Sequence, residues 1–203
     1  MKNRSNSHEF SVWPLMIDML SSIFIIYIIQ STILSPDAFE KLRIQQKRRV
    51  FAQEVERMLS TQIQEGQVAL ESKFDYLKIT FSELILFEGG EYNLNLKGRQ
   101  TLRLLAALIP KKDEKSDKVY KIQVEGHTDK AQLVRNDYPR NNWELSTARA
   151  LEVIDFFTKK NNCQPNLFSA NGFGEFNPVD ESKPSRNRRV EMKVYFSEEA
   201  SKK

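Results

Sequence analysis

The residue whose type and position most clearly suggest a chemical role is Asp18. It is the one charged side chain within an apolar run that covers residues 13–34. That run is long enough for a helix to cross a hydrocarbon core of about 30 Å, because an α-helix rises about 1.5 Å per residue. A carboxyl group in hydrocarbon costs roughly 2.5–3.5 kcal/mol, so it normally faces protein or water and handles protons or ions. Apolar surroundings favour its neutral form and polar neighbours favour its charged form, which makes Asp18 a candidate proton carrier.

Two small hydroxyl residues, Ser21 and Ser22, follow Asp18 at three and four residues along the chain. On a helix, these spacings place all three side chains on one face. A small polar face suits a helix that packs against partner helices around an ion path, since small residues permit close approach and hydroxyls form hydrogen bonds. The alternatives are that Asp18 marks the end of a shorter span or pairs structurally with a neighbouring helix. An acid with hydroxyl neighbours also suits sodium, so the coupling ion stays open.

A second set of polar residues surrounds Asp129, which follows a predicted strand. Arg149 offers a planar fork of donors suited to a carboxylate, so the acid and the base together suit a zwitterionic ligand. Asn142 and Arg149 are two helical turns apart, and Leu145 lies between them on a predicted helix. The alternative is an Asp129–Arg149 salt bridge that only holds a loop. Asp129 is accompanied by an arginine rather than by a second carboxylate or metal ligands, so we do not expect an enzyme.

Composition limits the class of protein and the kinds of partner that we expect. The chain has 203 residues, ordinary hydrophobic content and few glycines and prolines, which predicts one modest soluble domain beside the span. Its formal charge of +4 accompanies no nucleic-acid-binding motif, so we expect no direct nucleic-acid partner. The single cysteine, Cys163, excludes an intrachain disulfide and has no metal-ligand set around it. His127, beside a strand end, is expected to be structural, and we expect no cofactor or metal.

Apolar periodicity predicts the secondary structure of the soluble part. Alternation of apolar and polar residues indicates half-buried strands, and apolar faces at i, i+3, i+4 and i+7 indicate two helices between them. The order strand, helix, strand, helix, strand, strand predicts an α+β domain in which a mixed β-sheet carries helices on one face. The strands are expected at 77–81, 120–124, 167–171 and 190–196, and the helices around 102–109, after a cap at Asn95, and 150–157.

The segment between the span and the soluble domain is rich in Gln, Glu, Lys and Arg. From Phe39 to about Leu70 it contains hardly any helix breaker before Gly66, which predicts a helical stalk. Its apolar residues form a loose stripe, so pairing with a second copy is compatible with the pattern without being required by it.

Four short blocks of sequence, in this order and on these predicted elements, resemble the OmpA-like family of peptidoglycan-binding domains. They are residues 124–129 (VEGHTD), 141–150 (NNWELSTARA), 172–178 (GFGEFNP) and 187–191 (NRRVE). The resemblance implies that Asp129 and Arg149 hold the ammonium and carboxylate groups of diaminopimelate in the peptidoglycan stem peptide. The chain departs from the family pattern at Gln132, where glycine is common, and in a longer loop after Asp129. The residues that the resemblance implies as the lining of this site are Thr128, Asn142 and Leu145.

The acid-bearing span and the block Asn-Trp-Glu-Leu-Ser resemble the MotB family of flagellar stator B subunits. The blocks Gly-Phe-Gly-Glu and Asn-Arg-Arg-Val-Glu are closer to the general OmpA form than to flagellar MotB, and the connector is short. The span, with Trp-Pro before Asp18, and the overall size are similar to the ZorB family of the Zorya anti-phage defence system. The ZorB resemblance implies a proton-driven rotary motor in the inner membrane that conducts protons through Asp18. Its implied partners are ZorA/MotA-like membrane subunits, five around two copies of this chain, together with peptidoglycan and membrane lipids. A flagellar MotB role and a passive tether are the alternatives.

Domain boundaries and topology follow from these features. The apolar run exceeds that of a signal peptide, carries an acid and lacks a small-x-small cleavage site, so we expect it to be retained. Basic residues after the span would, alone, place the large domain in the cytoplasm. Peptidoglycan lies outside the inner membrane, however, so a site for it requires a periplasmic C-terminal domain. The expected segments are a cytoplasmic tail at 1–12, the transmembrane helix 13–34, a helical linker 35–72, the OmpA-like domain 73–197 and a C-terminal tail 198–203.

Overall fold

The computed structural model describes residues 12–33, 36–112, 120–133 and 136–196. The chain divides into two compact units, residues 1–43 and 44–203. The C-terminal tail expected at 198–203, and the expected N-terminal tail apart from Val12, lie outside the described residues.

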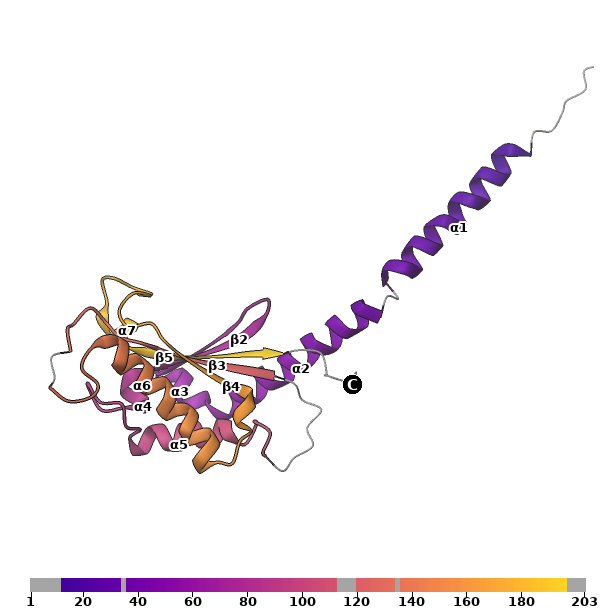
Figure 1. Cartoon of the computed structure of the whole chain (residues 1–203). Helices are drawn as coiled ribbons and strands as arrows, with labels where there is room; N and C mark the ends of the chain where they lie inside the picture. The colour runs from indigo at the N-terminus through magenta and orange to yellow at the C-terminus, as the bar shows by residue number, and fades with distance from the viewer. Residues whose placement is uncertain (1–11, 34–35, 113–119, 134–135, 197–203) are drawn as a thin grey trace, which may run out of the picture. The chain divides into compact units, whose positions relative to one another are not determined.

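The first unit contains α1, Trp13–Ile33, an uninterrupted helix (Figure 1) of mainly apolar residues in which Asp18 is the one charged residue. Its stretch Trp13–Ser31 is long and apolar enough to cross a membrane, and none of it is buried within this chain. A helix of such apolar composition needs an apolar environment, either a protein core or a bilayer. Helix α1 is therefore a candidate transmembrane span, as the sequence predicts.

The second unit is built on a five-stranded sheet in the order β1-β2-β5-β3-β4 (Figure 1). Strands β3 and β4 run parallel, while the other neighbouring strands run antiparallel. The central pair β3–β5 is in register with Val124 opposite Met192. The predicted mixed sheet is confirmed. The strands are β1 Val68–Ser72, β2 Tyr76–Ser82, β3 Tyr120–His127, β4 Phe168–Gly172 and β5 Arg189–Phe196.

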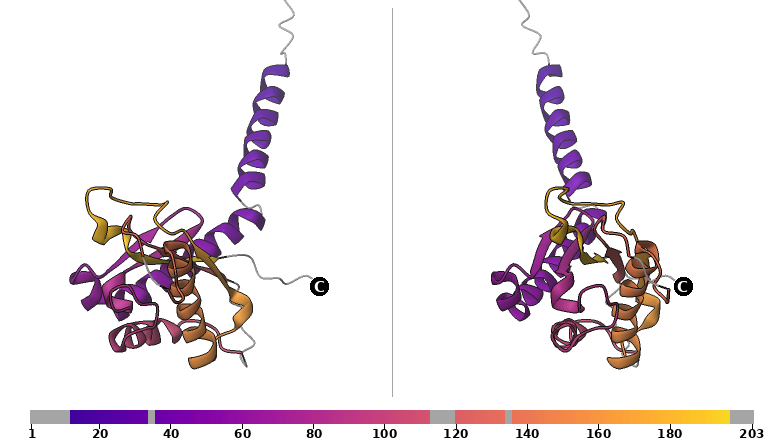
Figure 2. Two further views of the ribbon diagram at one scale, coloured as in Figure 1. Left: turned by 60° about the vertical axis from the view of Figure 1, so that its left-hand side comes forward. Right: turned by 90° about the vertical axis from the view of Figure 1, so that its left-hand side faces the viewer.

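Helices α5, Leu96–Ala106, and α6, Asn142–Asp155, lie on one face of this sheet, as predicted (Figures 1 and 2). Asn95 caps α5, since its side chain accepts a hydrogen bond from the Gly98 amide at 2.7 Å. The apolar side of each helix meets the inward-facing residues of the sheet to form the core. Core residues include Ile79, Phe81, Leu102, Leu105, Ile122, Val124, Val153, Met192 and Val194. Shorter elements are α4 Glu83–Leu86, the π-helical turn Phe156–Lys160, the 3-10 turn Pro165–Leu167 and α7 Pro184–Asn187.

The segment expected to be a helical stalk ends earlier than predicted. Helix α2, Pro36–Met58, is followed by the short helix α3, Ser60–Gln64. The chain then turns at Gly66, whose φ of +67° is accessible to glycine at little cost. The prediction of helix as far as Leu70 is wrong, because β1 pairs with β2 along one edge of the sheet.

The apolar stripe of α2 belongs to the core of the same chain over its C-terminal part. Phe51 and Val55, on α2, and Leu59, directly after it, are buried in the domain core. The Phe51 ring also packs against Tyr120 and Phe196, at centroid distances of 5.8 and 5.6 Å. These side chains are therefore not available for the pairing with a second copy that the sequence left open.

Candidate functional site

The residues predicted to bind a ligand in the soluble domain gather where β3 ends and α6 begins. Strand β3 ends at His127, so Thr128 and Asp129 follow it directly, and Asn142 opens α6. The loop after β4 joins them, since the Thr128 amide donates a hydrogen bond to the Gly174 carbonyl at 2.9 Å. Because β3 and β4 are parallel, the loops after both strands lie at the same end of the sheet.

Two glycines let α6 lie directly on these strands. A Cβ atom on Gly126 would lie 1.9 Å from the backbone oxygen of Ser146, and a Cβ atom on Gly172 would lie 2.1 Å from Thr147 Oγ1. Any side chain at either position would push the helix away from the sheet. The glycines therefore hold the start of α6 close to the loop that carries Asp129.

Asn142 holds the loop of Asp129 in place. Its Nδ2 donates to the carbonyl oxygens of Asp129 at 3.3 Å and Ala131 at 3.0 Å, and to Glu175 Oε2 at 2.6 Å. The Asp129 carboxylate accepts a further hydrogen bond from the Ala131 amide at 3.1 Å. Asn142 thus lies at the predicted site, but its amide group is used to position the loop.

Asp129 and Arg149 belong to one charged network in which other residues stand between them. Arg149 Nη2 donates to a carboxylate oxygen of Glu83, on α4. Arg188 Nε donates to the second Glu83 oxygen at 2.6 Å, and its Nη1 donates to Asp129 Oδ2 at 2.6 Å. The salt bridge of Asp129 is therefore made with Arg188, and not with Arg149 as the sequence alternative supposed.

Arg149 is the buried end of this network, with 1% of its surface exposed. Its Nε donates to the Glu91 carbonyl at 2.9 Å, and its guanidinium lies 5.1 Å from the centre of the Phe87 ring. Burial lowers the pKa of the Arg149 guanidinium, while the Glu83 carboxylate opposes that shift. The guanidinium stays charged because arginine starts from so high a pKa.

Arg188 and Asp129 are the accessible end of the network. Their side chains are 33% and 12% exposed, whereas that of Glu83 is 5% exposed. The hydrogen bond to Asp129 raises the pKa of the Arg188 guanidinium. The surface of the site therefore presents one cation and one anion side by side, with the Arg149 charge behind them.

The two remaining predicted lining residues, Thr128 and Leu145, lie under the same surface, and each is 4% exposed. Thr128 Oγ1 has no hydrogen-bond partner within the described part of the chain. A buried hydroxyl without a partner carries a free-energy cost, which a polar ligand atom could remove.

His127 belongs to a buried polar cluster on the sheet. Ligand atoms of Glu125, His127 and Glu191 lie within 4.8 Å of one another, which is the spacing of a metal site. Both carboxylates already have cationic partners, however: Lys193 Nζ lies 2.8 Å from Glu125, and Arg189 Nε lies 2.6 Å from Glu191. A divalent cation would have to displace both, so we read the cluster as structural.

In the first unit, the structure gives the surroundings of Asp18 within α1. Ser21 Oγ donates to the Ile17 carbonyl at 2.7 Å, and Ser22 Oγ donates to the Asp18 carbonyl at 2.9 Å. Both hydroxyls are therefore satisfied by their own helix. The Asp18 side chain is exposed in the single chain, on a helix whose other side chains from Trp13 to Ser31 are uncharged.

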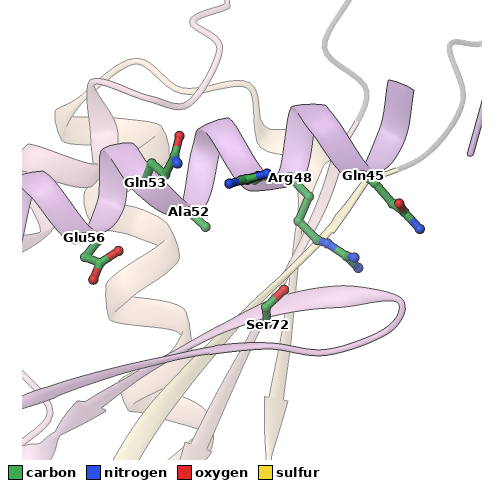
Figure 3. Close-up of a pocket in the computed structure, with 7 residues that line it drawn as sticks. Gln45, Arg48, Ala52, Gln53, Glu56 and Ser72 are labelled. Carbon is green, nitrogen blue, oxygen red and sulfur yellow. The ribbon is translucent and has the colours of Figure 1, made fainter. Parts of the chain in front are cut away.

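A polar groove of about 400 Å³ lies elsewhere in the second unit, between α2 and β1 (Figure 3). Arg48 lies in it and donates from Nη1 to the carbonyl oxygens of Lys73, at 2.7 Å, and Phe74. These contacts hold the turn between β1 and β2 against the helix. The lining residues are Gln45, Arg48, Arg49, Ala52, Gln53, Glu56 and Ser72, none of which belongs to the Asp129 network.

Sequence reasoning missed Glu83 and Arg188 as members of the site. Arg188 lies in the block NRRVE, which had been singled out only for its resemblance. That block was the signal in the sequence that could have identified Arg188 as a site residue. No local pattern indicates Glu83, because it lies 66 residues from Arg149 and 105 residues from Arg188.

Comparison with known proteins identifies the family of the second unit. The profile of the OmpA family matches residues 86–191. The uncharacterized protein YtxE of Bacillus subtilis is 37% identical over 131 residues, which cover 61% of this chain and 50% of YtxE. Motility protein B of the same organism is 26% identical over 145 residues, covering 70% of this chain and 53% of that protein. The chain thus spans about half the length of the curated relatives it matches.

Solved structures show the same domain. The cell wall anchor of the T6SS from Pseudomonas aeruginosa is 27% identical, with a TM-score of 0.60, over 70% of this chain and 97% of that one. A MotB-like protein from Desulfovibrio vulgaris, 23% identical with a TM-score of 0.66 over 77% and 99% of the two chains, shares the fold. The OmpA and MotB-like proteins form a structural and not an enzymatic family, as expected here. Since the family profile covers more than half of the sequence, this chain belongs to the OmpA family.

Proposed function

We propose that this chain is the B-type subunit of an ion-driven motor in the bacterial inner membrane, anchored to peptidoglycan through its OmpA domain. The observation that carries the proposal is the union, in one chain, of an apolar helix with a single carboxyl group and an OmpA-family domain. Similarity to motility protein B supports the role in a motor, and similarity to a cell wall anchor supports the attachment to peptidoglycan. Asp18 moves the ion, and the soluble domain holds the motor still against the wall.

The wall ligand of the proposal is the zwitterionic end of diaminopimelate. Its ammonium group meets Asp129, and its carboxylate meets Arg188 at the surface with Arg149 behind, since the network presents these charges together. The Thr128 hydroxyl, which has no hydrogen-bond partner within the described residues, hydrogen-bonds to a polar atom of the same ligand. Leu145 and Asn142 shape the floor and hold the loop.

The test is sedimentation of the chain with purified sacculi. Arg188→Ala removes the accessible cation and should reduce the bound fraction at least tenfold. Arg186→Ala is the matched control, because Arg186 is a neighbouring arginine whose side chain is 64% exposed and pairs with Asp180. Equal binding by the Arg188 variant and the parent, with both folded, would reject the site.

The proposed ion step is reversible protonation of the Asp18 carboxyl group between two access states. A proton that moves down a membrane potential releases about 2.3 kcal/mol per 100 mV, which must exceed the cost of reburying the carboxyl group. Ser21 and Ser22 supply hydroxyls on the same face. Asp18→Asn keeps the size of the side chain but cannot ionise, so vesicles that contain the assembled motor should lose proton flux while assembly persists. Asp18→Glu is the control that keeps an acid. Unchanged flux in the Asn variant would leave a passive tether as the function.

The proposed assembly has two copies of this chain within five A-type membrane subunits. Two soluble domains then face the wall, and the mismatch of two against five lets each protonation favour a step of rotation. The topology has a cytoplasmic N-terminus and a periplasmic C-terminal domain. Protease should therefore cleave the C-terminal domain in spheroplasts, and protection of that domain would contradict this orientation.

For the machine that the motor serves, we propose a ZorB-type role in anti-phage defence. The Trp-Pro before Asp18 and the overall size support it, and the blocks Gly-Phe-Gly-Glu and Asn-Arg-Arg-Val-Glu and the short connector speak against the flagellar form. A second candidate is a flagellar stator subunit, favoured by the 26% identity with motility protein B. Deletion of the gene separates them: a defence role predicts more efficient phage plating with normal swimming, and a flagellar role predicts the reverse.

A further inference from the structure

Two large aromatic side chains stack on the surface beside the Asp129 network. The rings of Trp143 and Phe176 have centroids 5.1 Å apart and planes 24° apart. Despite this contact, Trp143 is 52% exposed and Phe176 is 62% exposed. Trp143 and Phe176 thus form an exposed aromatic surface next to residues of the polar site, and ligand sites commonly combine aromatic side chains with a few placed polar groups.

The aromatic pair is attached to the same two segments that build the site. Trp143 follows Asn142 in the first turn of α6. Phe176 follows Glu175, whose carboxylate accepts the 2.6 Å hydrogen bond from Asn142. The aromatic pair is therefore carried by the two segments that Asn142 joins to the loop of Asp129.

The pair is not needed to hold the loop that carries Phe176. Hydrogen bonds already fix that loop: the Gly174 amide donates to Ser146 Oγ at 3.0 Å, and the Phe176 amide donates to the Phe173 carbonyl at 3.2 Å. The stack also buries less than half of either side chain. The exposed ring surface is thus held in place by the backbone and remains available to a ligand.

The acid next to Trp143 is already paired with a base. Glu144, next to Trp143, is paired with Arg140 through a contact of 2.7 Å between Oε1 and Nη2. The positive charge of Arg140 therefore balances the negative charge of Glu144. The exposed faces of the two rings are themselves apolar, so a flat, uncharged group is the best match for them.

We infer that Trp143 and Phe176 form a stacking surface for a sugar ring, specifically an N-acetylhexosamine of the glycan strand. The C–H groups on one face of a pyranose ring are apolar and pack flat on an aromatic ring. This inference rests on the proposed function, because the glycan is covalently joined to the stem peptide that the Asp129 network binds. The aromatic surface extends that site from the peptide to the sugar.

The experiment compares two ligands on the full chain in detergent micelles, by calorimetry. The first is a diaminopimelate-containing stem tripeptide without sugar, and the second is the same peptide joined to an N-acetylglucosaminyl-N-acetylmuramic acid disaccharide. The parent should bind the second ligand more tightly. Trp143→Ala should weaken disaccharide-peptide binding about tenfold and change tripeptide binding less than twofold, and Phe176→Ala should act in the same direction. Trp143→Phe, which keeps a ring, should retain most of the affinity.

Phe74→Ala is the control for loss of an exposed aromatic side chain, since Phe74 is 90% exposed at the β1–β2 turn. Equal affinity of parent and Trp143→Ala for the disaccharide-peptide would overturn the inference and leave the proposed function intact. Equal weakening of both ligands would also overturn it, because the aromatic pair would then only support the peptide site. A parent chain that binds neither ligand would refute the proposed function and this inference with it.

Discussion

Arg149→Ala should destabilise the soluble domain strongly, although a residue used only to bind a ligand would be dispensable for folding. The guanidinium is 1% exposed and contacts Glu83, the Glu91 carbonyl and the Phe87 ring. Removing one partner of a buried ion pair costs about 3–5 kcal/mol, because the other charge is left behind. Glu83 keeps its contact with Arg188 at 2.6 Å, so we expect the lower end, about 3 kcal/mol.

The assay is urea unfolding of residues 44–203, the second compact unit, followed by circular dichroism. With an m-value of about 2 kcal/mol/M, a loss of about 3 kcal/mol lowers the urea midpoint by about 1.5 M. A domain of this size has about 5–15 kcal/mol of stability in total, so the variant should remain measurable.

Two further variants test the reasoning behind this magnitude. Arg186→Ala removes an exposed ion pair with Asp180 and should cost less than about 1 kcal/mol. Glu83→Gln combined with Arg149→Met removes both buried charges, so the double variant should be more stable than the sum of the single changes predicts. A midpoint for Arg149→Ala that matches the Arg186→Ala control would refute the burial and the pairing that we describe.

The remaining predictions concern the sheet. Burial raises the pKa of Glu125, but the nearby His127, at 3.7 Å, and the hydrogen bond from Lys193 outweigh it and lower that pKa below 4.5. This stabilisation is therefore present at neutral pH and lost in acid. Lys193→Met should therefore cost about 2 kcal/mol near pH 7 and progressively less below pH 4.5, measured by urea unfolding across that range. Gly126→Ala should cost more than about 3 kcal/mol or abolish folding, because the new Cβ atom would lie 1.9 Å from a backbone oxygen. Gly89→Ala is the control and should be tolerated, because its Cβ atom would have nothing within 4 Å. Similar melting temperatures for the two variants would contradict this packing.

Local patterns predicted much of this protein. The apolar run around Asp18 predicted α1, and the period-two alternation around Ile79, Ile122 and Val194 predicted three strands of the sheet. Polar, breaker-poor sequence predicted helix correctly as far as Gln64, apart from the break after Met58, but it was misleading beyond Gly66, where it predicted helix to about Leu70 and the chain forms β1. Helix propensity is a weak preference, and the open edge of β2 made a strand more stable at 68–72.

The sequence by itself determined which residues could do chemistry, because residue type, hydropathy and spacing are local properties. It identified Asp18 in the apolar helix, and Asp129 with Arg149 in the domain. Only the tertiary structure decided which charges meet. Packing brought Glu83 between Arg149 and Arg188, and it gave Asp129 a different arginine from the one expected. Such pairings depend on the folding together of segments 59 to 105 residues apart, and no local pattern encodes them.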